Sequence, residues 1–377
     1  MKVGIMSMQR VYNYGSYMQA YGLKKMIESL GHEVVFVDYK VGKPIIHNKS
    51  DRINYIKGKF KNIIFKVIEH NKLLIETNIL PKELKYAVRS HYQYQQLYWS
   101  KLGLDKKKHY RTAVDVLVIG SDEVFNCLQE NIDVGYSREL FGYHSNAKKI
   151  ITYAASFGNA TLFQLKKEGL INCIKEDFKK ISCFSVRDKN TLEIVEKLTQ
   201  RNDIYENFDP VLMHDFSELE KKPIAISNYL IVYAYRGRLT KEEEEAIKKF
   251  AKIKQKQIVC IGGYHKFCDI YIQESPLRIF DYFRKADYVI TDTFHGTIFS
   301  VINHAKVGVF VRSGHGKKYG NSEKLLDLLK KLQLEDRIIT NIELMDNILD
   351  KEIDYNSVDA IIAKERQQAI NYLNQSL

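Results

Sequence analysis

The N-terminal segment alternates apolar runs with a stretch of helical periodicity. Residues 2–8 and 33–38 are dominated by apolar side chains and predict two buried strands. Between them, residues 16–30 place apolar side chains on one side of a helix, and Gly31 is the residue type expected just after a helix ends. This order predicts a β-α-β unit, which begins a parallel sheet.

The same alternation continues to the C-terminus. Further apolar runs predict strands at 114–119, 150–155, 183–186, 229–235, 257–261, 287–290 and 307–312, and helical spacing predicts helices at 240–254, 276–286, 296–304 and about 356–375. A polar segment at 209–223, which holds two of the five prolines, separates the two series. We therefore predict an α/β fold with two Rossmann-like domains that face a cleft, residues 1–215 and 216–377.

Positive charge is concentrated in one segment of the chain. The net charge is +12, and residues 43–111 contain 16 Lys and Arg against 5 Asp and Glu. We expect a mainly helical excursion from the N-terminal domain over about 43–112. Within it, residues 53–68 carry apolar side chains at helical spacing with lysines between them. Such a helix either packs on the domain with a solvated lysine face or lies on an anionic membrane surface.

Composition excludes several classes of protein. Hydrophobic residues make up 45% of the chain and charged residues 28%, which is typical of a soluble globular protein. No apolar run reaches the roughly 18 residues of a membrane span, and the N-terminal run is too short for a signal peptide.

The five cysteines form no CxxC pair and predict reduced thiols in the cytoplasm. Cys260 and Cys268 match no zinc pattern, so we expect no metal. No nucleic-acid recognition motif accompanies the local basicity, so we expect no nucleic-acid partner.

Two loops that follow predicted strands carry candidate site residues, because ligands bind outside the carboxyl ends of strands in open parallel sheets. The loop Asn13-Tyr14-Gly15 lacks the GxGxxG pattern of dinucleotide sites, so it is either a turn with Ser16 as the helix N-cap or a loop that contacts the substrate. After strand 114–119, Gly120 allows a close backbone approach. Ser121 and Asp122 then either cap a helix, or Asp122 and Glu123 orient sugar hydroxyls or act as a base.

A third loop gives the strongest chemical signal. Residues 291–296 read Thr-Asp-Thr-Phe-His-Gly and join a strand to a helix, so Thr293 or His295 lies at a helix N-terminus, where an anion is favoured. His295 could serve there as a general acid or base, or it could cap or pack the turn. Cations that could meet an anion at this edge, or remain solvated surface charges, are Arg236, Arg238, Arg312 and Lys317.

Taken together, these segments resemble the polysaccharide pyruvyl transferase family from Gly4 to about Arg337. The resemblance rests on the order of short motifs: Asn13-Tyr14-Gly15, Gln19-Ala20-Tyr21, Gly31-His32-Glu33-Val34, Gly120-Ser121-Asp122, Tyr153-Ala154-Ala155-Ser156-Phe157-Gly158, Ser185-Val186-Arg187-Asp188, Asp209-Pro210-Val211-Leu212 and Asp292-Thr293-Phe294-His295-Gly296. The chain departs from the family at Glu123 and Phe125, where Gln and Trp are usual, and at Glu323, where Arg is usual.

The resemblance implies a GT-B-like arrangement and the transfer of pyruvate from phosphoenolpyruvate to a glycan sugar as a ketal, in surface or exopolysaccharide biosynthesis. It implies no cofactor beyond phosphoenolpyruvate as co-substrate, and a glycan or lipid-linked sugar as acceptor. His295, Asp122 and Glu123 would be catalytic, and Asn13, Tyr14 and Gly15 would contact the acceptor. The donor would be bound by Arg236, Arg238, Thr293, Gly296, Arg312, Lys317, Asn321 and Ser322. A glycosyltransferase that uses a nucleotide-sugar donor is the alternative. We expect a cytoplasmic enzyme, either free or peripheral at the inner membrane surface.

Overall fold

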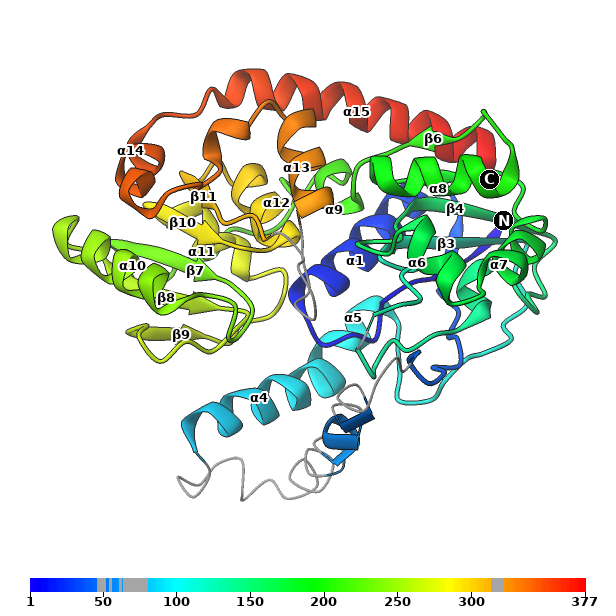
Figure 1. Cartoon of the computed structure of the whole chain (residues 1–377), viewed down its shortest axis with the longest axis horizontal. Coiled ribbons are helices and arrows are strands. Elements are labelled where there is room, and N and C mark those ends of the chain that lie inside the picture. Colours follow the sequence, from blue (N-terminus) through cyan, green and yellow to red (C-terminus); the bar gives the residue numbers. More distant parts are fainter. Residues whose placement is uncertain (46–51, 54–55, 61–62, 64–80, 130, 313–321) are drawn as a thin grey trace. The chain divides into compact units, whose positions relative to one another are not determined.

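The computed structural model divides the chain into two compact units (Figure 1). It describes residues 1–45, 52–53, 56–60, 63, 81–129, 131–312 and 322–377. Unit 1 comprises residues 1–12, 19–209 and 372–377, and unit 2 comprises residues 13–18 and 210–371. The first turn of helix α1 (Tyr14–Ser29) therefore belongs to unit 2, although the rest of that helix is in unit 1. The last turn of helix α15 (Tyr355–Ser376) belongs to unit 1, although the rest of that helix is in unit 2.

Unit 1 is built on a parallel sheet of order β2-β1-β3-β4-β5-β6. Its strands are β1 (Lys2–Met6), β2 (Glu33–Phe36), β3 (Val116–Asp122), β4 (Lys149–Ala155), β5 (Ser185–Val186) and β6 (Tyr205–Glu206). Its helices are α1 (Tyr14–Ser29), α4 (Lys82–Gln93), the π-helix η1 (Tyr94–Tyr98), α5 (Trp99–Leu102), η2 (Arg138–Phe141), α6 (Leu162–Lys167), α7 (Ile171–Phe178) and α8 (Lys189–Thr199). The predicted β-α-β start and the strands near 114–119 and 150–155 are confirmed.

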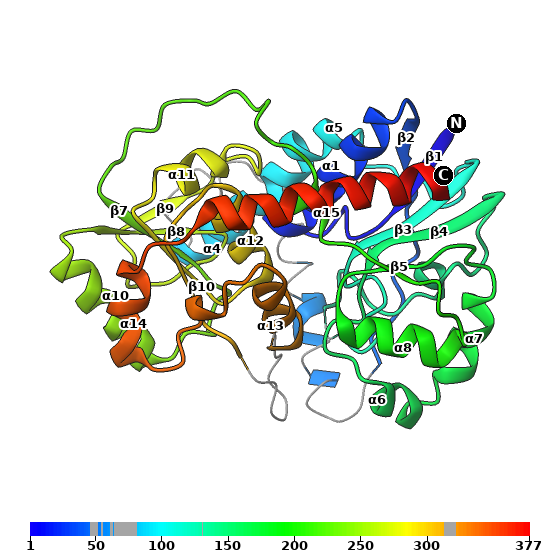
Figure 2. The ribbon, with the colours of Figure 1, turned by 90° about the horizontal axis from the view of Figure 1, so that it is seen from above.

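Four phenylalanines form the centre of the unit 1 core. The rings of Phe125, Phe141, Phe157 and Phe178 pack on one another with centroids 5.1–6.4 Å apart, and all four are buried. Helices α7 and α8 pack side by side at this end of the unit (Figure 2). Phe125 thus fills the core position at which the family usually has Trp, and this departure preserves an aromatic side chain inside the fold.

Unit 2 is built on a parallel sheet of order β11-β10-β7-β8-β9. Its strands are β7 (Tyr229–Tyr233), β8 (Gln257–Ile261), β9 (Ile270–Ile272), β10 (Tyr288–Thr291) and β11 (Val307–Val309). Its helices are α9 (Pro210–Met213), α10 (Lys241–Ile253), α11 (Ile279–Lys285), α12 (Phe294–Ile302), α13 (Ser322–Lys331), η3 (Glu335–Arg337), η4 (Ile342–Leu344), α14 (Met345–Asp350) and α15 (Tyr355–Ser376). The α/β class with parallel sheets is therefore confirmed for both halves of the chain.

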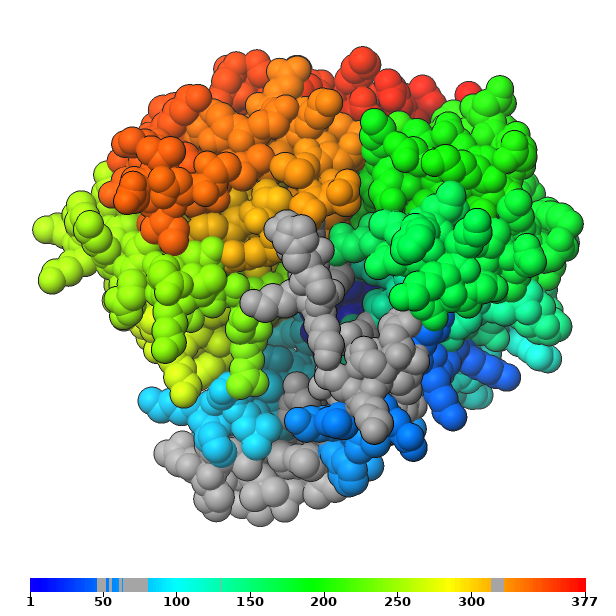
Figure 3. Space-filling view, viewed as in Figure 1, coloured from blue at the N-terminus to red at the C-terminus, as the bar shows by residue number. Residues whose placement is uncertain are grey.

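Helix α10 illustrates how local sequence specifies these elements. Thr240 accepts a hydrogen bond from the backbone N–H of Glu243, and the Glu243 carboxylate accepts one from the N–H of Thr240, which completes a capping box. Ile247 and Phe250 are buried in the core, while Lys241 and Lys249 are exposed. The part of the chain that contains α10 is lime green in Figure 3. The amphipathic pattern thus fixes which face of the helix is buried.

The basic excursion is helical over much of its described part, but residues 43–45 and 103–112 are not helical. Residues 52–53, 56–60 and 63 are helical, as are α4, η1 and α5. Residues 54–55, 61–62 and 64–80, and with them much of the amphipathic stretch 53–68, lie outside the described residues. Among the helices that the structure describes, none is long and apolar enough to cross a membrane.

Candidate active site

Both sheets reverse their strand order next to their first strand. In unit 1 the chain runs outward from β1 to β2 and then returns to place β3 on the other side of β1. In unit 2 it runs from β7 to β8 and β9, and then places β10 on the other side of β7. In open α/β sheets such a reversal opens a crevice at the carboxyl ends of the two strands. The predicted site loops lie at these two positions.

His295 lies at the start of α12, directly after β10. Thr293 is the N-cap: its hydroxyl accepts from the N–H of Gly296 at 2.9 Å. His295 is the second residue of the helix and is 9% exposed. The prediction of a helix N-terminus at Thr293 or His295 is confirmed. Of the alternative that His295 caps or packs the turn, capping is wrong, because Thr293 is the cap, whereas the His295 ring is buried and packed. This end of the helix is an anion-favouring position beside a titratable ring.

Gly296 is required by packing. A Cβ at this position would lie 2.2 Å from the Thr291 hydroxyl oxygen and 2.6 Å from that of Thr293. Thr291 in turn donates to the carbonyl of Tyr233 at 2.6 Å, which ties the end of β10 to the end of β7. Glycine therefore lets α12 begin directly against the sheet edge.

Two arginines flank a buried carboxylate at this edge. The side chain of Asp292 is fully buried, and its carboxylate lies 3.8 Å from Nη1 of Arg238 and 3.7 Å from Nε of Arg312. Because β10 lies between β7 and β11, Asp292 is placed between the segments that carry the two arginines. Burial raises the pKa of Asp292, although both guanidinium groups and the N–H of Tyr235 oppose the shift.

The two arginines are held in different ways. Arg312 forms a bidentate ion pair with the buried carboxylate of Glu243, at 2.6 and 2.8 Å. Burial lowers the pKa of Arg312, but hydrogen bonding and charge attraction to Glu243 and Asp292 together raise it, so the net shift is upward. Arg238 is stacked over the ring of Tyr235, with its guanidinium carbon 4.4 Å from the ring centroid. Arg236 is exposed on the same loop.

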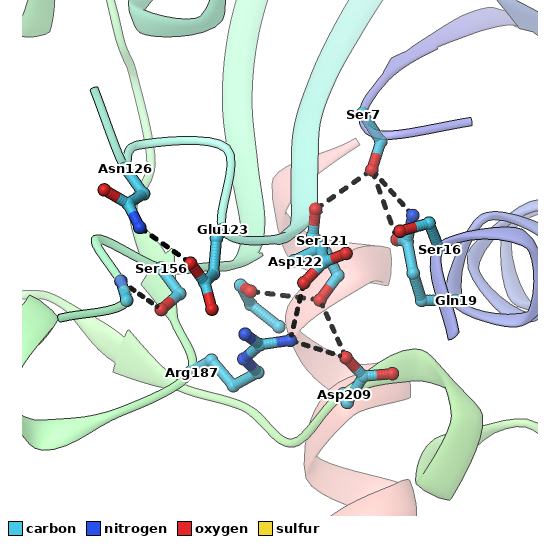
Figure 4. Close-up of polar contacts among 12 residues, drawn as sticks. Ser7, Ser16, Gln19, Ser121, Asp122, Glu123, Asn126, Ser156, Arg187 and Asp209 are labelled. Carbon is cyan, nitrogen blue, oxygen red and sulfur yellow. Dashed lines mark hydrogen bonds and ion pairs between the residues drawn. The ribbon is translucent and has the colours of Figure 1, made fainter. Parts of the chain in front are cut away.

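The corresponding edge of unit 1 is rich in carboxylates (Figure 4). Arg187 is buried and donates to Asp209 at 2.8 Å, and its Nη1 lies 3.5 Å from the carboxylate of Asp122. The carboxylates of Asp188 and Glu123 also attract the positive charge of Arg187. Burial lowers the pKa of Arg187, and the four carboxylates together raise it above its ordinary value. Asp122 keeps 14% of its side chain exposed and is the most exposed carboxylate of this group.

Ser121 and Asp122 do not cap a helix, because no helix follows them. The Ser121 hydroxyl instead donates to the carbonyl of Ala154 at 3.1 Å. Gly120 has a φ of 125°, and a Cβ there would lie 2.1 Å from the carbonyl oxygen of Tyr153, so the expected close backbone approach is confirmed.

Glu123, the second predicted catalytic carboxylate, is held inside the loop. It accepts from the Asn126 amide at 2.7 Å and lies against Gly158, where a Cβ would be 2.5 Å from its Oε2. Glu123 is 9% exposed, so this departure from the family's usual Gln introduces a buried carboxylate that is paired with an amide.

The loop at Asn13 belongs to unit 2. The Asn13 side chain accepts from the N–H of Ser16 at 2.7 Å, so Asn13 caps α1, and the interpretation of Ser16 as the N-cap is wrong. Tyr14 donates its hydroxyl hydrogen bond to the carbonyl of Glu274 at 2.9 Å. Gly15 lies directly against the ring of His295.

Of the remaining donor candidates, the structure describes only Ser322. Ser322 begins α13, and its N–H donates to the carbonyl of Arg312 at 3.2 Å. Glu323 occupies the first turn of the same helix. Lys317 and Asn321 lie outside the described residues.

Sequence reasoning did not select four of the residues that organise these edges: Arg187, Asp209, Glu243 and Asp292. Arg187 and Asp292 directly follow strands, and that position was the available signal. Among the described residues no group of three or more His, Cys, Asp or Glu is arranged to hold a metal ion. All five cysteines are free thiols.

Comparison with known proteins identifies the family. The family model for polysaccharide pyruvyl transferase matches residues 13–314, which include both sheet edges. The chain belongs to the polysaccharide pyruvyl transferase family. The family assignment supports a transferase. A search of curated proteins returns no match.

Solved structures of low sequence identity cover nearly the whole chain. S. aureus MnaA in a co-structure with UDP is 10% identical, with 100% of this chain and 97% of that chain covered and a TM-score of 0.47. The UDP-GlcNAc 2-epimerase of Methanocaldococcus jannaschii is 12% identical, with 97% and 99% covered and a TM-score of 0.46. Glycosyltransferase SsfS6 of Streptomyces sp. SF2575 is 10% identical, with 100% and 99% covered and a TM-score of 0.45. The functional assignment rests on the family and on the site residues.

Proposed function

We propose that this protein transfers pyruvate from phosphoenolpyruvate to two hydroxyl groups of a glycan sugar, forming a ketal in surface or exopolysaccharide biosynthesis. The observation that carries the proposal is the edge at β7 and β10. There His295, the N-terminus of α12 and the two arginines around Asp292 gather at one strand reversal. A small donor with a carboxylate and a phosphate needs this combination of anion-binding groups and a proton donor.

The reaction needs one proton delivered to carbon and two removed from oxygen. Protonation of the methylene carbon of phosphoenolpyruvate makes a methyl group and leaves the neighbouring carbon electron-poor. The first sugar hydroxyl adds to that carbon and loses its proton. The bond from this carbon to the phosphate oxygen then breaks, the second hydroxyl adds and loses its proton, and inorganic phosphate departs with one of the two hydroxyl protons. The other proton replaces the one given to the methylene carbon.

The residues divide these tasks by charge. His295 is the proton donor, either to the methylene carbon or to the departing phosphate. The N-terminus of α12, Arg238 and Arg312 bind the anionic groups of the donor, and Arg236 is the exposed cation of the same loop. Asp122 accepts a hydroxyl proton from the acceptor, because it is the most exposed carboxylate of its cluster. Glu123 supports that loop through Asn126.

The direct test is phosphate release from phosphoenolpyruvate across a panel of nucleotide-linked and lipid-linked sugars. We expect release that depends on one acceptor, and a product heavier by one pyruvyl ketal. Thermal protection gives the comparison with the alternative donor: phosphoenolpyruvate should raise the melting temperature, and nucleoside diphosphates should not. Protection by nucleoside diphosphates alone would support the nucleotide-sugar glycosyltransferase instead.

A second proposal concerns location at a membrane surface. In the basic excursion Ile53, Ile56, Phe60 and Ile63 are 44–62% exposed, and Lys57 and Lys59 are exposed beside them. The helix also contacts the body of unit 1, since a Cβ at Gly58 would lie 2.9 Å from Ile132. Exposed apolar side chains among lysines suit an anionic lipid surface, where each lysine contributes about 1 kcal/mol.

Vesicle sedimentation tests this location. The native chain should bind phosphatidylserine vesicles at low salt, and Phe60→Asp should weaken binding. Phe163→Asp, which alters an exposed phenylalanine on α6, is the matched control and should bind like the native chain. Absence of binding by the native chain at low salt would contradict the proposal.

A further inference from the structure

The Asn13-Tyr14-Gly15 turn has a structural relation to His295 that the proposed mechanism leaves unused. Residues 13–18 form part of unit 2, together with the loop that carries His295. A Cβ on Gly15 would lie 2.2 Å from Nδ1, 2.4 Å from Cγ and 2.8 Å from Cε1 of His295. These distances are far shorter than van der Waals contact, so the backbone of Gly15 forms a wall against one side of the imidazole.

The other contacts of the ring restrict where it could move. His295 is buried, and the rings of Phe294 and Phe299 lie 5.4 and 6.1 Å from it between centroids. Phe299 is itself fully buried. The imidazole therefore has packed neighbours besides Gly15, and a side chain at residue 15 must displace either the ring or the turn.

The turn is anchored on its own side as well. The Tyr14 hydroxyl donates to the carbonyl of Glu274, and the Asn13 side chain caps the helix through the N–H of Ser16. Tyr14 is buried. Two separate hydrogen bonds thus hold the turn where Gly15 meets the ring.

We propose that Gly15 is a positioning residue for His295, because only glycine lets the first turn of α1 pack flat against the imidazole. This places the Asn13-Tyr14-Gly15 turn on the donor side of the reaction and not in acceptor recognition. The inference rests on the proposed function for its kinetic consequence, whereas the packing of the ring against the turn does not. A proton donor must be held in a fixed geometry, and a displacement of about 1 Å can cost about 100-fold in rate.

The test uses Gly15→Ala in the full chain, observed through histidine ring resonances. With 13C-labelled histidine, the His295 Cε1–H signal is assigned by its loss in His295→Ala, and the chain's other ten histidines serve as internal references. We expect Gly15→Ala to shift the His295 signal and to leave that of His304 in place. We also expect kcat to fall about 100-fold with a change in KM for phosphoenolpyruvate of less than about threefold.

Control variants separate positioning from helix stability. Alanine favours helix more than glycine does, so Gly15→Ala should not weaken α1 itself. Ser29→Ala, at the other end of α1, makes a comparable change in propensity and should leave the His295 signal and kcat unchanged. If Gly15→Ala does not fold, Tyr14→Phe removes the anchor to Glu274, and it should shift the His295 signal by less.

Each outcome decides the inference. An unmoved His295 signal in folded Gly15→Ala, or in Tyr14→Phe if that variant must be used, would overturn it. An unchanged kcat in Gly15→Ala would do the same. If the native enzyme releases no phosphate from phosphoenolpyruvate but the His295 signal still moves, the proposed function fails and the packing inference stands.

Discussion

The carboxyl edges of the two sheets have the same topology and opposite chemistry. In unit 1 one buried arginine, Arg187, is surrounded by four carboxylates. In unit 2 one fully buried carboxylate, Asp292, lies between two arginines, with His295 at the adjacent helix start. A reversal of strand order creates each crevice, and the residues that follow the strands decide which ligand it favours. The unit 1 edge suits a neutral polyol whose hydroxyls must lose protons, and the unit 2 edge suits a small anion.

Loss of the imidazole should have the largest effect. His295→Ala should lower kcat about 1,000-fold, because it removes the proposed proton donor, and general acid-base catalysis contributes about 100- to 10,000-fold. His304→Ala is the matched control, since His304 is exposed just beyond the same helix and pairs with Asp359. Steady-state kinetics with saturating acceptor measures both. Full activity in His295→Ala would show that the assignment of roles is wrong.

A substitution at the unit 1 edge should impair the reaction of the acceptor and leave donor binding unchanged. Asp122→Asn should lower kcat about 100-fold, because an amide cannot accept the hydroxyl proton. The affinity for phosphoenolpyruvate should stay unchanged in a direct binding measurement. Asp115→Asn provides the control, since Asp115 precedes the same strand at its opposite end. A loss of donor affinity with no loss of kcat would reverse the division between the two edges.

Substitution of either arginine should weaken donor binding equally, but only one substitution should destabilise the fold. Arg238→Gln and Arg312→Gln should each raise KM for phosphoenolpyruvate about tenfold, which corresponds to the loss of one charge-assisted hydrogen bond. Only Arg312→Gln should also lower the free energy of unfolding, by about 3 kcal/mol, because it leaves Glu243 buried without its guanidinium. Denaturant titration of the two variants distinguishes them, and equal stabilities would contradict the different anchoring of the arginines.

The smallest effect concerns Asp292 and pH. Its pKa is raised by burial, so the folded protein holds this proton more tightly than the unfolded chain does. The stabilisation from protonated Asp292 is complete at pH values below the pKa that this residue has in the unfolded chain. It is lost as the pH rises through the raised pKa of the folded protein. Asp292→Asn cannot ionise, so its melting temperature should improve relative to the native protein between about pH 4 and neutrality.

Asp336 provides the opposite case. A hydrogen bond from Arg337 lowers the pKa of Asp336 to about 2, despite partial burial. The melting-temperature difference between Asp336→Asn and the native protein should therefore stay constant from about pH 5 to neutrality. If the melting-temperature differences of Asp292→Asn and Asp336→Asn from the native protein changed with pH in the same way, burial would not be the cause of the raised pKa at Asp292.

Much of the fold could be predicted from apolar runs. The strands of parallel sheets are buried on both faces, so β3, β7 and β8 appear as continuous hydrophobic segments. The three-residue strand β9 and the two-residue strand β6 were missed, because so short a run carries no usable period. The cap of α1 was placed at Ser16 and not at Asn13, since both residue types are good caps and only the position of the first helical residue decides between them.

The candidate site was less predictable for a different reason. Position after a strand could be read from the sequence, and it located Asp122, Arg238 and His295. Contacts between residues distant in the sequence could not be read. Arg312 pairs with Glu243 across 69 residues, and the Gly15 backbone meets His295 across most of the chain. Such contacts depend on the strand order of the sheet and on which unit residues 13–18 join.

Hydrogen-deuterium exchange of the full chain with phosphoenolpyruvate or UDP tests most directly whether the donor binds at the unit 2 edge. We expect phosphoenolpyruvate to slow amide exchange most strongly in residues 291–300, which include the start of α12, and UDP to have no such effect. Slower exchange with UDP and none with phosphoenolpyruvate would contradict the proposed donor. A phosphoenolpyruvate effect centred on residues 120–126 would contradict the assignment of the donor to the unit 2 edge.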